Sequence, residues 1–180
     1  EHNLPYDQVF QVIADRYMAV QINLGIKVDL LKYFEEIKEN LKNGASSDYV
    51  ASRGEYLSGV LMSAYIGYDF VDTTGLIKFD EKGKLMMEET DKALREELQK
   101  HDNAVIPGFY GSGTDGFVKT FSRGGSDITG ALVARAVGAD VYENWTDVSG
   151  FLMADPRIIK NPLPIQRISY KELRELSYMG

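Results

Sequence analysis

The first 66 residues carry apolar positions at the spacing of amphipathic helices. In the first segment these positions recur every three or four residues and end at Gly25: Val9, Val12, Ile13, Tyr17 and Val20. Asn3 and Pro5 precede this run and are start signals for a helix. A second helix is expected from Asp29 to Asn43-Gly44, and a third from about Ser47 to Ile66.

The third helical segment has small residues along one side. Glu55, Gly59 and Ser63 are spaced by four residues, with Gly54 and Ser58 adjacent. Glycine inside a helix costs roughly 1 kcal/mol relative to alanine, so another group is expected to approach this side closely. Tight packing of the helix on a sheet is the simpler explanation, and a ligand beside Glu55 is the alternative.

After Gly67 the pattern changes to short apolar runs bounded by turn residues, which is typical of strands. Strands are expected at 70–72, 76–79, 104–109 and 141–145, and helices at 88–100, 126–137 and 170–179. Thr114-Asp115-Gly116 is typical of a hairpin turn, because Asp-Gly tolerates the positive φ that such turns need. Residues 151–156 are expected to form a loop. Strands that alternate with helices predict an α/β sandwich around a largely parallel sheet.

Composition narrows the class of protein. The chain has 180 residues, 44% of them hydrophobic and 26% charged, as in a globular domain with its own core. A net charge of -7 argues against nonspecific binding to nucleic acid or to an anionic membrane. The longest apolar run, at 60–66, is too short to span a bilayer. Without cysteine the chain has no disulfide or thiolate metal site, which fits a reducing compartment, and we expect a cytoplasmic protein.

The two histidines, His2 and His101, lie far apart in the sequence. They show no metal-ligand spacing, so both are expected at the surface and no metal ligand is predicted among the side chains of this chain.

Residues Ser122 to Asp127 point most directly to chemistry. They read Ser-Arg-Gly-Gly-Ser-Asp and open an apolar segment that ends at Gly138. The N–H groups of Gly124 and Gly125 can approach a ligand closely, and a helix start adds the positive end of its dipole. Arg123 adds a planar guanidinium suited to carboxylate or phosphate. Taken alone, the same residues also describe an ordinary helix start with Ser126 or Asp127 as its cap.

Two later segments each have a functional and a structural explanation. Thr146-Asp147 closes an expected buried strand, where open α/β sheets bind their ligands, and it also fits a plain turn. Asp155-Pro156-Arg157 supplies a basic side chain, but Asp-Pro commonly initiates turns. Neither segment decides a function by itself.

The order of the motifs is more specific than any one of them. Three motifs carry a resemblance to the aspartate kinases of the amino acid kinase family: Ser52-Arg53-Gly54-Glu55-Tyr56-Leu57-Ser58, then Ser122-Arg123-Gly124-Gly125-Ser126-Asp127, then Thr146-Asp147-Val148-Ser149-Gly150 through Asp155-Pro156-Arg157. The resemblance covers residues 46–180, and residues 1–45 are similar to the more variable helical part of the same catalytic domain. It implies a three-layer α/β/α sandwich with a mainly parallel sheet.

The resemblance also implies a reaction. The γ-phosphoryl group of ATP, with Mg²⁺, would pass to the side-chain carboxylate of L-aspartate and give 4-phospho-L-aspartate, the entry to lysine, threonine and methionine biosynthesis. A carboxylate nucleophile is already ionised at neutral pH, so no general base is required. Catalysis would then consist mainly of positioning and charge neutralisation.

Roles for single residues follow from the same resemblance. Arg123 would hold L-aspartate through a carboxylate, together with the backbone of Gly124, Gly125 and Ser126. Glu55 would receive the substrate ammonium, and Asp127 would orient that ammonium or the catalytic cations. The positions that match nucleotide contacts are Thr146, Asp147, Leu152 and Arg157, with Arg157 reaching phosphate.

The chain departs from the family pattern in several places. Ser122 stands where glycine is usual, and Leu152 where an aromatic residue often packs near the nucleotide. The opening Lys-Phe-Gly-Gly-Ser-Ser segment of the family is not found before Glu1, and a segment that completes the nucleotide site is expected after Gly180. Regulatory domains usually follow. The sequence therefore resembles a catalytic-domain fragment that is incomplete at both ends, and we expect it to be inactive alone.

An unpaired sheet neighbour at the missing first strand invites association through that edge, so a homo-oligomer is expected. Two alternatives to the aspartate reaction stay open. A sister enzyme would act on glutamate or on an acylated amino acid, although Glu55 beside Arg123 favours a free amino group. A noncatalytic module that binds nucleotide or amino acid, or that oligomerises, is supported by the absence of the lysine segment.

Overall fold

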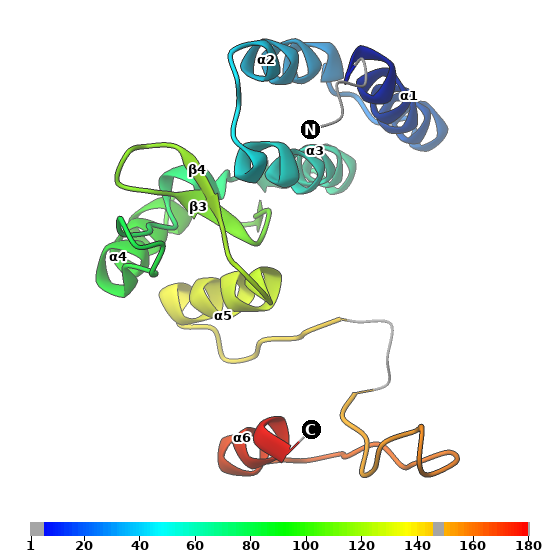
Figure 1. The fold of residues 1–180 in the computed structure, drawn as a ribbon, viewed down its shortest axis with the longest axis vertical. Helices are drawn as coiled ribbons and strands as arrows, with labels where there is room; N and C mark the ends of the chain where they lie inside the picture. Colours follow the sequence, from blue (N-terminus) through cyan, green and yellow to red (C-terminus); the bar gives the residue numbers. More distant parts are fainter. Residues whose placement is uncertain (1–5, 146–149, 180) are drawn as a thin grey trace. The chain divides into compact units, whose positions relative to one another are not determined.

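The computed structural model describes residues 6–145 and 150–179. It divides the chain into two units, which meet in the sequence between Tyr142 and Glu143. The first unit contains nearly all of the secondary structure (Figure 1). The second contains one helix and a loop, and each unit is described by itself.

Three helices open the first unit, at the positions that the sequence predicts: α1 (Tyr6–Leu24), α2 (Leu30–Lys42) and α3 (Ser47–Ile66). Side-chain caps explain where α2 and α3 begin. The Asp29 carboxylate accepts a hydrogen bond from the Leu31 N–H, and Ser46 Oγ accepts one from the Tyr49 N–H. The start signals Asn3 and Pro5 lie outside the described residues. The helices pack through one apolar cluster, which includes Phe10, Leu30, Phe34, Leu57 and Val60.

Short strands follow and lie between two groups of helices (Figure 1). They are β1 (Asp69–Phe70), β2 (Ala104–Val105), β3 (Tyr110–Ser112) and β4 (Val118–Thr120), with a 3-10 turn η1 (Thr73–Gly75) after β1. Helices α4 (Met87–Leu98) and α5 (Gly125–Val137) cover the side opposite α1–α3. The unit is thus an α/β/α arrangement in three layers, as expected.

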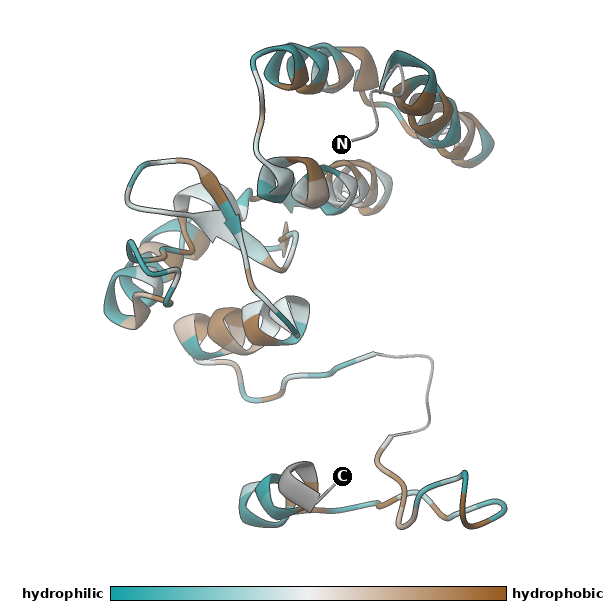
Figure 2. Ribbon diagram, in the orientation of Figure 1, coloured by the Kyte–Doolittle hydropathy of each residue, from teal (hydrophilic) through white to brown (hydrophobic). Residues whose placement is uncertain are grey.

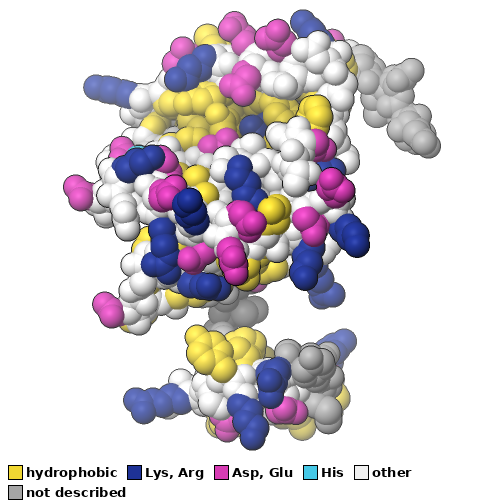
Figure 3. Space-filling model, turned by 90° about the vertical axis from the view of Figure 1, so that its left-hand side faces the viewer, with side chains coloured by type: hydrophobic (Ala, Val, Ile, Leu, Met, Phe, Trp, Pro, Cys, Tyr) yellow, Lys and Arg dark blue, Asp and Glu magenta, His cyan; other side chains and the backbone are white. Residues whose placement is uncertain are grey.

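A second apolar cluster joins α4 and α5 to the strand layer, and it includes Val71, Ile77, Phe79, Leu94 and Leu132. Figure 2 shows that much of α5 is hydrophobic, and Leu132 and Ala136 are its buried members of this cluster. On the face drawn in Figure 3, hydrophobic side chains gather in the upper part of the unit, where α1–α3 lie, and acidic and basic side chains are interspersed below them.

The strands are shorter than the apolar runs suggest. β1 and β2 pair in parallel, Lys78 forms a parallel bridge to Ser112, and β3 and β4 form an antiparallel hairpin. The hairpin turns at Thr114-Asp115-Gly116, where Gly116 has φ 78°, as predicted. The strand expected at 104–109 ends at Val105. Pro107 has no N–H to donate, and Phe109 has φ 62°, which is outside the strand region.

The buried strand expected at 141–145 is wrong. These residues form no strand, and their side chains are exposed, with Trp145 at 89% and Val141 at 72%. The Trp145 Nε1–H donates to the nearby Glu143 carboxylate at 3.0 Å. An apolar run becomes a buried strand only where neighbours offer ladder partners, and the described residues offer none to this segment.

The second unit consists of a long loop, which includes the loop expected at 151–156, and helix α6 (Tyr170–Met179), which lies at the expected position. Leu152 and Pro164 form an antiparallel bridge, and the Met153 N–H donates to the Leu163 carbonyl at 2.9 Å. Among the helices described in either unit, none has the length and hydrophobicity needed to cross a membrane.

Candidate functional site

Helix α5 begins at the two glycines that the sequence singles out. Gly124 is the N-cap residue, with φ 61° and ψ 23° in the left-handed region, and Gly125 is buried. A Cβ at Gly125 would lie 2.7 Å from the Cα of Phe109 and 2.8 Å from the Cβ of Phe121. The first position needs glycine for its backbone conformation and the second for space. The expectation that Ser126 or Asp127 caps the helix is wrong, because the helix begins one residue before them.

The side chains of Arg123, Ser126 and Asp127 are exposed around this helix start. Arg123 immediately precedes the N-cap, and Ser126 and Asp127 lie in the first turn. The first N–H groups of a helix have no intrahelical acceptor, and the helix dipole adds partial positive charge there. With the guanidinium of Arg123 alongside, this end of α5 suits an anionic group such as a carboxylate or a phosphate.

The loop from Pro107 to Phe109 lies against the start of α5. A Cβ at Gly108 would be 3.1 Å from the Cα of Ser126, so the two backbones are in close contact. The Phe109 N–H donates to Thr129 Oγ1 at 3.1 Å, and the Phe109 carbonyl accepts from the Phe121 N–H at 2.9 Å. Thr129 Oγ1 also donates to the Gly125 carbonyl at 2.8 Å. The loop and the helix start are therefore one connected piece of structure.

Glu55 is exposed on α3, one turn before Gly59 on the same helix face. A Cβ at Gly59 would lie 2.9 Å from the Phe70 ring and 3.6 Å from the Cβ of Pro107. Glycine here permits tight packing on the strand layer, as the simpler explanation predicts. The same contact turns the Glu55 face of α3 toward Pro107, where the loop that supports α5 begins.

Sequence reasoning missed a buried cation next to Glu55. The side chain of Arg53 is buried, and its guanidinium carbon lies 4.5, 4.4 and 5.5 Å from the ring centroids of Tyr49, Tyr56 and Tyr110. Its Nε and Nη2 donate to Ser52 Oγ at 3.1 and 2.9 Å. Within the described part of the chain, no carboxylate forms an ion pair with Arg53. Aromatic faces therefore take the place of a counter-ion.

The sequence holds part of this pattern. Tyr49 and Tyr56 stand four residues before and three residues after Arg53, which is the spacing of neighbours on a helix surface. Tyr110 comes from a strand far along the chain, and only the structure brings it to Arg53.

Tyr110 also connects this aromatic cluster to a carboxylate, Asp72. Its ring is fully buried, and its hydroxyl donates to Asp72 Oδ1 at 2.8 Å. The same oxygen accepts from the N–H and the hydroxyl of Thr74, at 3.2 and 3.1 Å. Burial, followed by the negative charge of Asp72, raises the pKa of Tyr110 far above its ordinary value, and burial raises the pKa of Tyr56 to about 12. Both phenols thus stay neutral at physiological pH.

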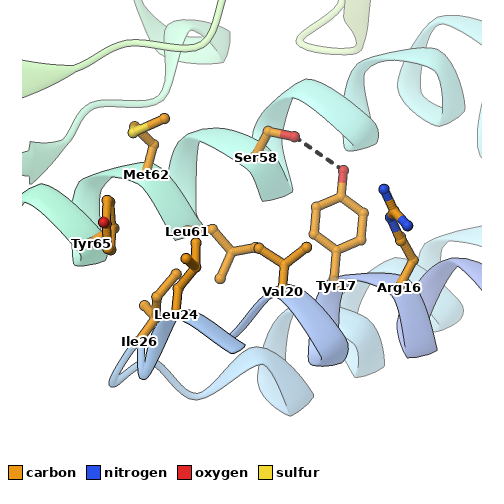
Figure 4. Close-up of a pocket in the computed structure, with 9 residues that line it drawn as sticks. All are labelled: Arg16, Tyr17, Val20, Leu24, Ile26, Ser58, Leu61, Met62 and Tyr65. Carbon is orange, nitrogen blue, oxygen red and sulfur yellow. Dashed lines mark hydrogen bonds between the residues drawn. The ribbon is translucent and has the colours of Figure 1, made fainter. Parts of the chain in front are cut away.

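A cavity of about 360 Å³ lies between α1 and α3 (Figure 4). Its walls are mostly apolar, and Tyr17 and Ser58 meet at one end of it, with their side-chain oxygens 3.2 Å apart. The Tyr17 hydroxyl also donates to the Gly54 carbonyl at 2.7 Å. The lining includes none of the site residues that the sequence predicts, so the cavity stands apart from the start of α5.

The nucleotide-contacting positions fall in the second unit or outside the described residues. Thr146 and Asp147 lie outside them. Leu152 is exposed beside its bridge to Pro164. Arg157 Nε and Nη2 donate to the Asp155 carboxylate at distances from 2.6 to 3.0 Å, and the Arg157 N–H donates to Asp155 Oδ1 at 2.8 Å. The turn explanation of Asp155-Pro156-Arg157 is therefore correct, and Arg157 remains an exposed cation on that turn.

Asp155 and Arg157 on this turn shift each other's pKa. The hydrogen bonds from Arg157 lower the pKa of Asp155, and the same contact raises the pKa of Arg157. Both groups are therefore charged at neutral pH. In the described ranges, 6–145 and 150–179, no group of three or more His, Cys, Asp or Glu residues could hold a metal ion.

These features define a class. The first unit is a three-layer α/β/α arrangement, and the model of the amino acid kinase family matches residues 12–180 of this chain. The chain belongs to the amino acid kinase family.

Within the family, the similar proteins are aspartate kinases. Aspartokinase 3 of Bacillus subtilis is 34% identical over 189 residues, a match that covers 96% of this chain and 41% of that protein. Aspartokinase 1, chloroplastic, of Arabidopsis thaliana is 33% identical over 182 residues, covering 89% of this chain and 32% of that protein. The chain thus spans about a third to two fifths of the length of these relatives.

Solved structures confirm the fold class. The aspartate kinase of Clostridium acetobutylicum has 53% sequence identity and a TM-score of 0.89, over 99% of this chain and 41% of that one. The R-state structure of Escherichia coli aspartokinase III in complex with aspartate and ADP has a TM-score of 0.77, over 96% of this chain and 43% of that one. Its sequence identity is 24%, so it supports the fold alone.

Proposed function

We propose that this protein is an aspartate kinase, which transfers the γ-phosphoryl group of ATP to the side-chain carboxylate of L-aspartate. The observation that carries the proposal is the start of α5. There Arg123, two obligatory glycines, Ser126 and Asp127 gather beside a loop that also contacts the Glu55 face of α3. The similarity to aspartate kinases of Bacillus subtilis and Clostridium acetobutylicum supports the same reaction.

An amino acid acceptor needs sites for two opposite charges. Arg123 and the N–H groups at the start of α5 would bind a carboxylate of the substrate, and Glu55 would bind its ammonium group. Neither group needs to change its protonation state, because the reacting carboxylate is ionised at neutral pH. Binding would hold that carboxylate in line with the phosphate, which is the main source of catalysis in phosphoryl transfer.

The nucleotide would use residues of the second unit. Arg157 is exposed, and its bonds to Asp155 use the Nε–H and one Nη2–H, so both hydrogens of Nη1 and the second hydrogen of Nη2 could reach phosphate without breaking that pair. Thr146, Asp147 and Leu152 are the further nucleotide contacts that we propose. Mg²⁺ usually binds through substrate phosphates and one or two carboxylates, and Asp127 in the first turn of α5 fits that need. When bound, the ion would neutralise phosphate charge.

The test is acyl-phosphate trapping with hydroxylamine in the natural full-length protein. We expect hydroxamate to form with Mg-ATP and L-aspartate, and to depend on both. The Arg123→Ala variant should lose the signal at the same aspartate concentration. Hydroxamate with L-glutamate in place of L-aspartate would replace our substrate assignment with the sister enzyme. Nucleotide binding without any hydroxamate would favour the noncatalytic module.

The same assay with residues 1–180 alone tests the expectation that this segment is inactive by itself. Two further expectations, association with identical copies and a cytoplasmic location, belong to this proposal as well. Light scattering of the purified full-length protein tests the first, and fractionation of the source cells tests the second.

A further inference from the structure

We propose that Tyr110, Asp72 and Arg53 form a positioning cluster, which holds the Pro107–Tyr110 loop between α3 and α5 and thereby sets the geometry of the acceptor site. The catalytic consequence rests on the proposed function, whereas the mechanical part stands on contacts within the first unit. All three are positioning residues rather than catalytic ones, because they are assigned no contact with the substrate.

The loop is attached at both of its ends to the same short segment. Thr73 Oγ1 donates to the Pro107 carbonyl at 3.2 Å, and the Tyr110 hydroxyl donates to Asp72 Oδ1 at 2.8 Å. Asp72 and Thr73 are consecutive, and the residues that they bind stand on either side of Gly108-Phe109. Both donors, Thr73 and Tyr110, are fully buried, whereas the acceptor Asp72 is partly buried.

The residue between the two attachments is strained. Phe109 has φ 62°, a conformation that bulky side chains rarely adopt and that costs on the order of 1–3 kcal/mol. Such a residue persists only where its surroundings fix it from several directions. Thr129 and Phe121 bind its N–H and carbonyl, and Asp72 and Thr73 hold its neighbours. If one of these hydrogen bonds is lost, Phe109 is free to leave the strained conformation.

A change in the conformation of this loop would directly alter the proposed acceptor site. Gly108 contacts Ser126, and Phe109 contacts Gly125, with no room for even a methyl group between Phe109 and Gly125. A shift of Phe109 toward α5 would displace the first turn of the helix, and a shift away would remove the contacts that support it. Its N–H groups and Arg123 are the proposed binders of the substrate carboxylate.

Arg53 ties the same loop to α3. Its guanidinium lies over the Tyr110 ring, at 5.5 Å from the centroid, while Asp72 accepts the hydroxyl of that ring. A cation on the ring face and an anion at the hydroxyl both favour the observed position of Tyr110, and a hydroxyl bonded to an anion makes the ring more electron-rich. Arg53 therefore links the loop to α3, the helix that also carries the proposed ammonium binder, Glu55.

Two tyrosines provide a matched experiment. Tyr110→Phe removes a hydroxyl that binds Asp72, whereas Tyr49→Phe removes a buried hydroxyl that binds neither Asp72 nor the 107–110 loop. Both rings face the same guanidinium. Both variants are to be made in the full-length protein. Amide exchange of Phe109 and Ile128, whose N–H groups donate to Thr129 Oγ1 and to the Gly124 carbonyl, is measured first, without ligand, and aspartate and ATP kinetics second.

We expect Tyr110→Phe to speed amide exchange at Phe109 and Ile128 about tenfold, as the loss of a hydrogen bond to a charged acceptor predicts. The KM for aspartate should rise about tenfold, with kcat and the KM for ATP within about twofold of the parent. Tyr49→Phe should change none of these. Asp72→Asn keeps an acceptor but loses the charge, and should shift exchange and the aspartate KM in the same direction by a smaller factor.

Equal effects of Tyr110→Phe and Tyr49→Phe would overturn the proposal, since the hydroxyl bond would then have no special role. Unchanged exchange in Tyr110→Phe would overturn it as well. A parent protein with no aspartate-dependent activity would instead remove the proposed function, and the exchange comparison would still decide whether the cluster holds the loop.

Discussion

The backbone nitrogen of Phe109 donates a hydrogen bond to Oγ1 of Thr129 at 3.1 Å, so a residue with positive φ is tied to the second turn of α5. This hydrogen bond joins two residues that are 20 positions apart in the sequence. It fixes the position of the helix start relative to the loop, and several consequences can be measured.

Thr129→Val should destabilise the protein by about 1–3 kcal/mol, because it keeps the shape of a buried residue but leaves the Phe109 N–H without its acceptor. Urea unfolding of both proteins measures the difference. Thr129→Ser keeps the hydroxyl and should retain most of the stability. If the serine variant is as unstable as the valine variant, the hydrogen bond is not the cause.

Gly125→Ala should be more damaging than its size suggests. The added methyl group would meet the Cα of Phe109 at 2.7 Å, and backbone cannot move aside as a flexible side chain does. We expect a loss of about 1–3 kcal/mol in unfolding free energy, with impaired use of aspartate. Gly75→Ala is the control, since nothing lies within 4 Å of its added methyl group. A similar loss at Gly75 would contradict the steric explanation.

Arg123→Ala and Glu55→Ala should each lower kcat/KM for aspartate by about 100-fold or more, because each leaves one charge of the zwitterionic substrate without its partner. The KM for ATP should stay within about twofold of the parent. Steady-state kinetics at varied aspartate and saturating Mg-ATP measure both. Arg135→Ala removes another exposed arginine of α5, which pairs with Asp91, and should leave the kinetics unchanged. Parental aspartate kinetics in either site variant would remove that residue from the site.

His101 predicts a pH dependence of stability. The sequence places it at the surface, but its side chain is only 20% exposed, with Nδ1 at 2.7 Å from Asp69 and Nε2 at 3.4 Å from Glu97. Hydrogen bonds to Asp69 and then Glu97 raise the pKa of His101 above its ordinary value. The protonated ring is thus favoured in the folded state, so its contribution is complete below the unfolded pKa and is lost as pH rises through the higher folded value.

The measurement is the melting temperature of the parent and of His101→Gln at about pH 5.5 and about pH 9. We expect the variant to melt lower at the acidic pH, with a smaller difference at the alkaline pH. Glu97 stays ionised at the acidic pH because Lys100 and His101 lower its pKa. A difference that grows with pH would show that the neutral ring is the favoured form.

Helix ends could be predicted because their causes are local. Asp29 and Ser46 cap α2 and α3, and Gly138 ends α5 in the left-handed conformation, all within a few residues of the signal in the sequence. The glycine pair at the start of α5 could be predicted for the same reason, whereas the close contact of Gly125 with Phe109 is visible only in the structure.

Strand lengths and the buried cluster depend on distant partners. The apolar run at 141–145 resembles a strand in every local respect, yet no described neighbour supplies its ladder, and Trp145 is 89% exposed. Likewise, Arg53 was identified as part of a motif, but its burial against Tyr110 depends on a strand that follows more than 50 residues later. Periodicity within one segment carries no information on such pairings.

The hydroxyl of Tyr17 gives the outermost helix an influence on Glu55. The Gly54 carbonyl that it binds belongs to the same rigid peptide plane as the Glu55 nitrogen, so a displacement of α1 reorients the backbone from which the Glu55 side chain departs. Under the proposed function, substitutions in α1 would therefore change the aspartate kinetics, although α1 contains none of the proposed site residues. In a screen for altered substrate affinity, changes near Tyr17 would be recovered alongside changes at Glu55 itself.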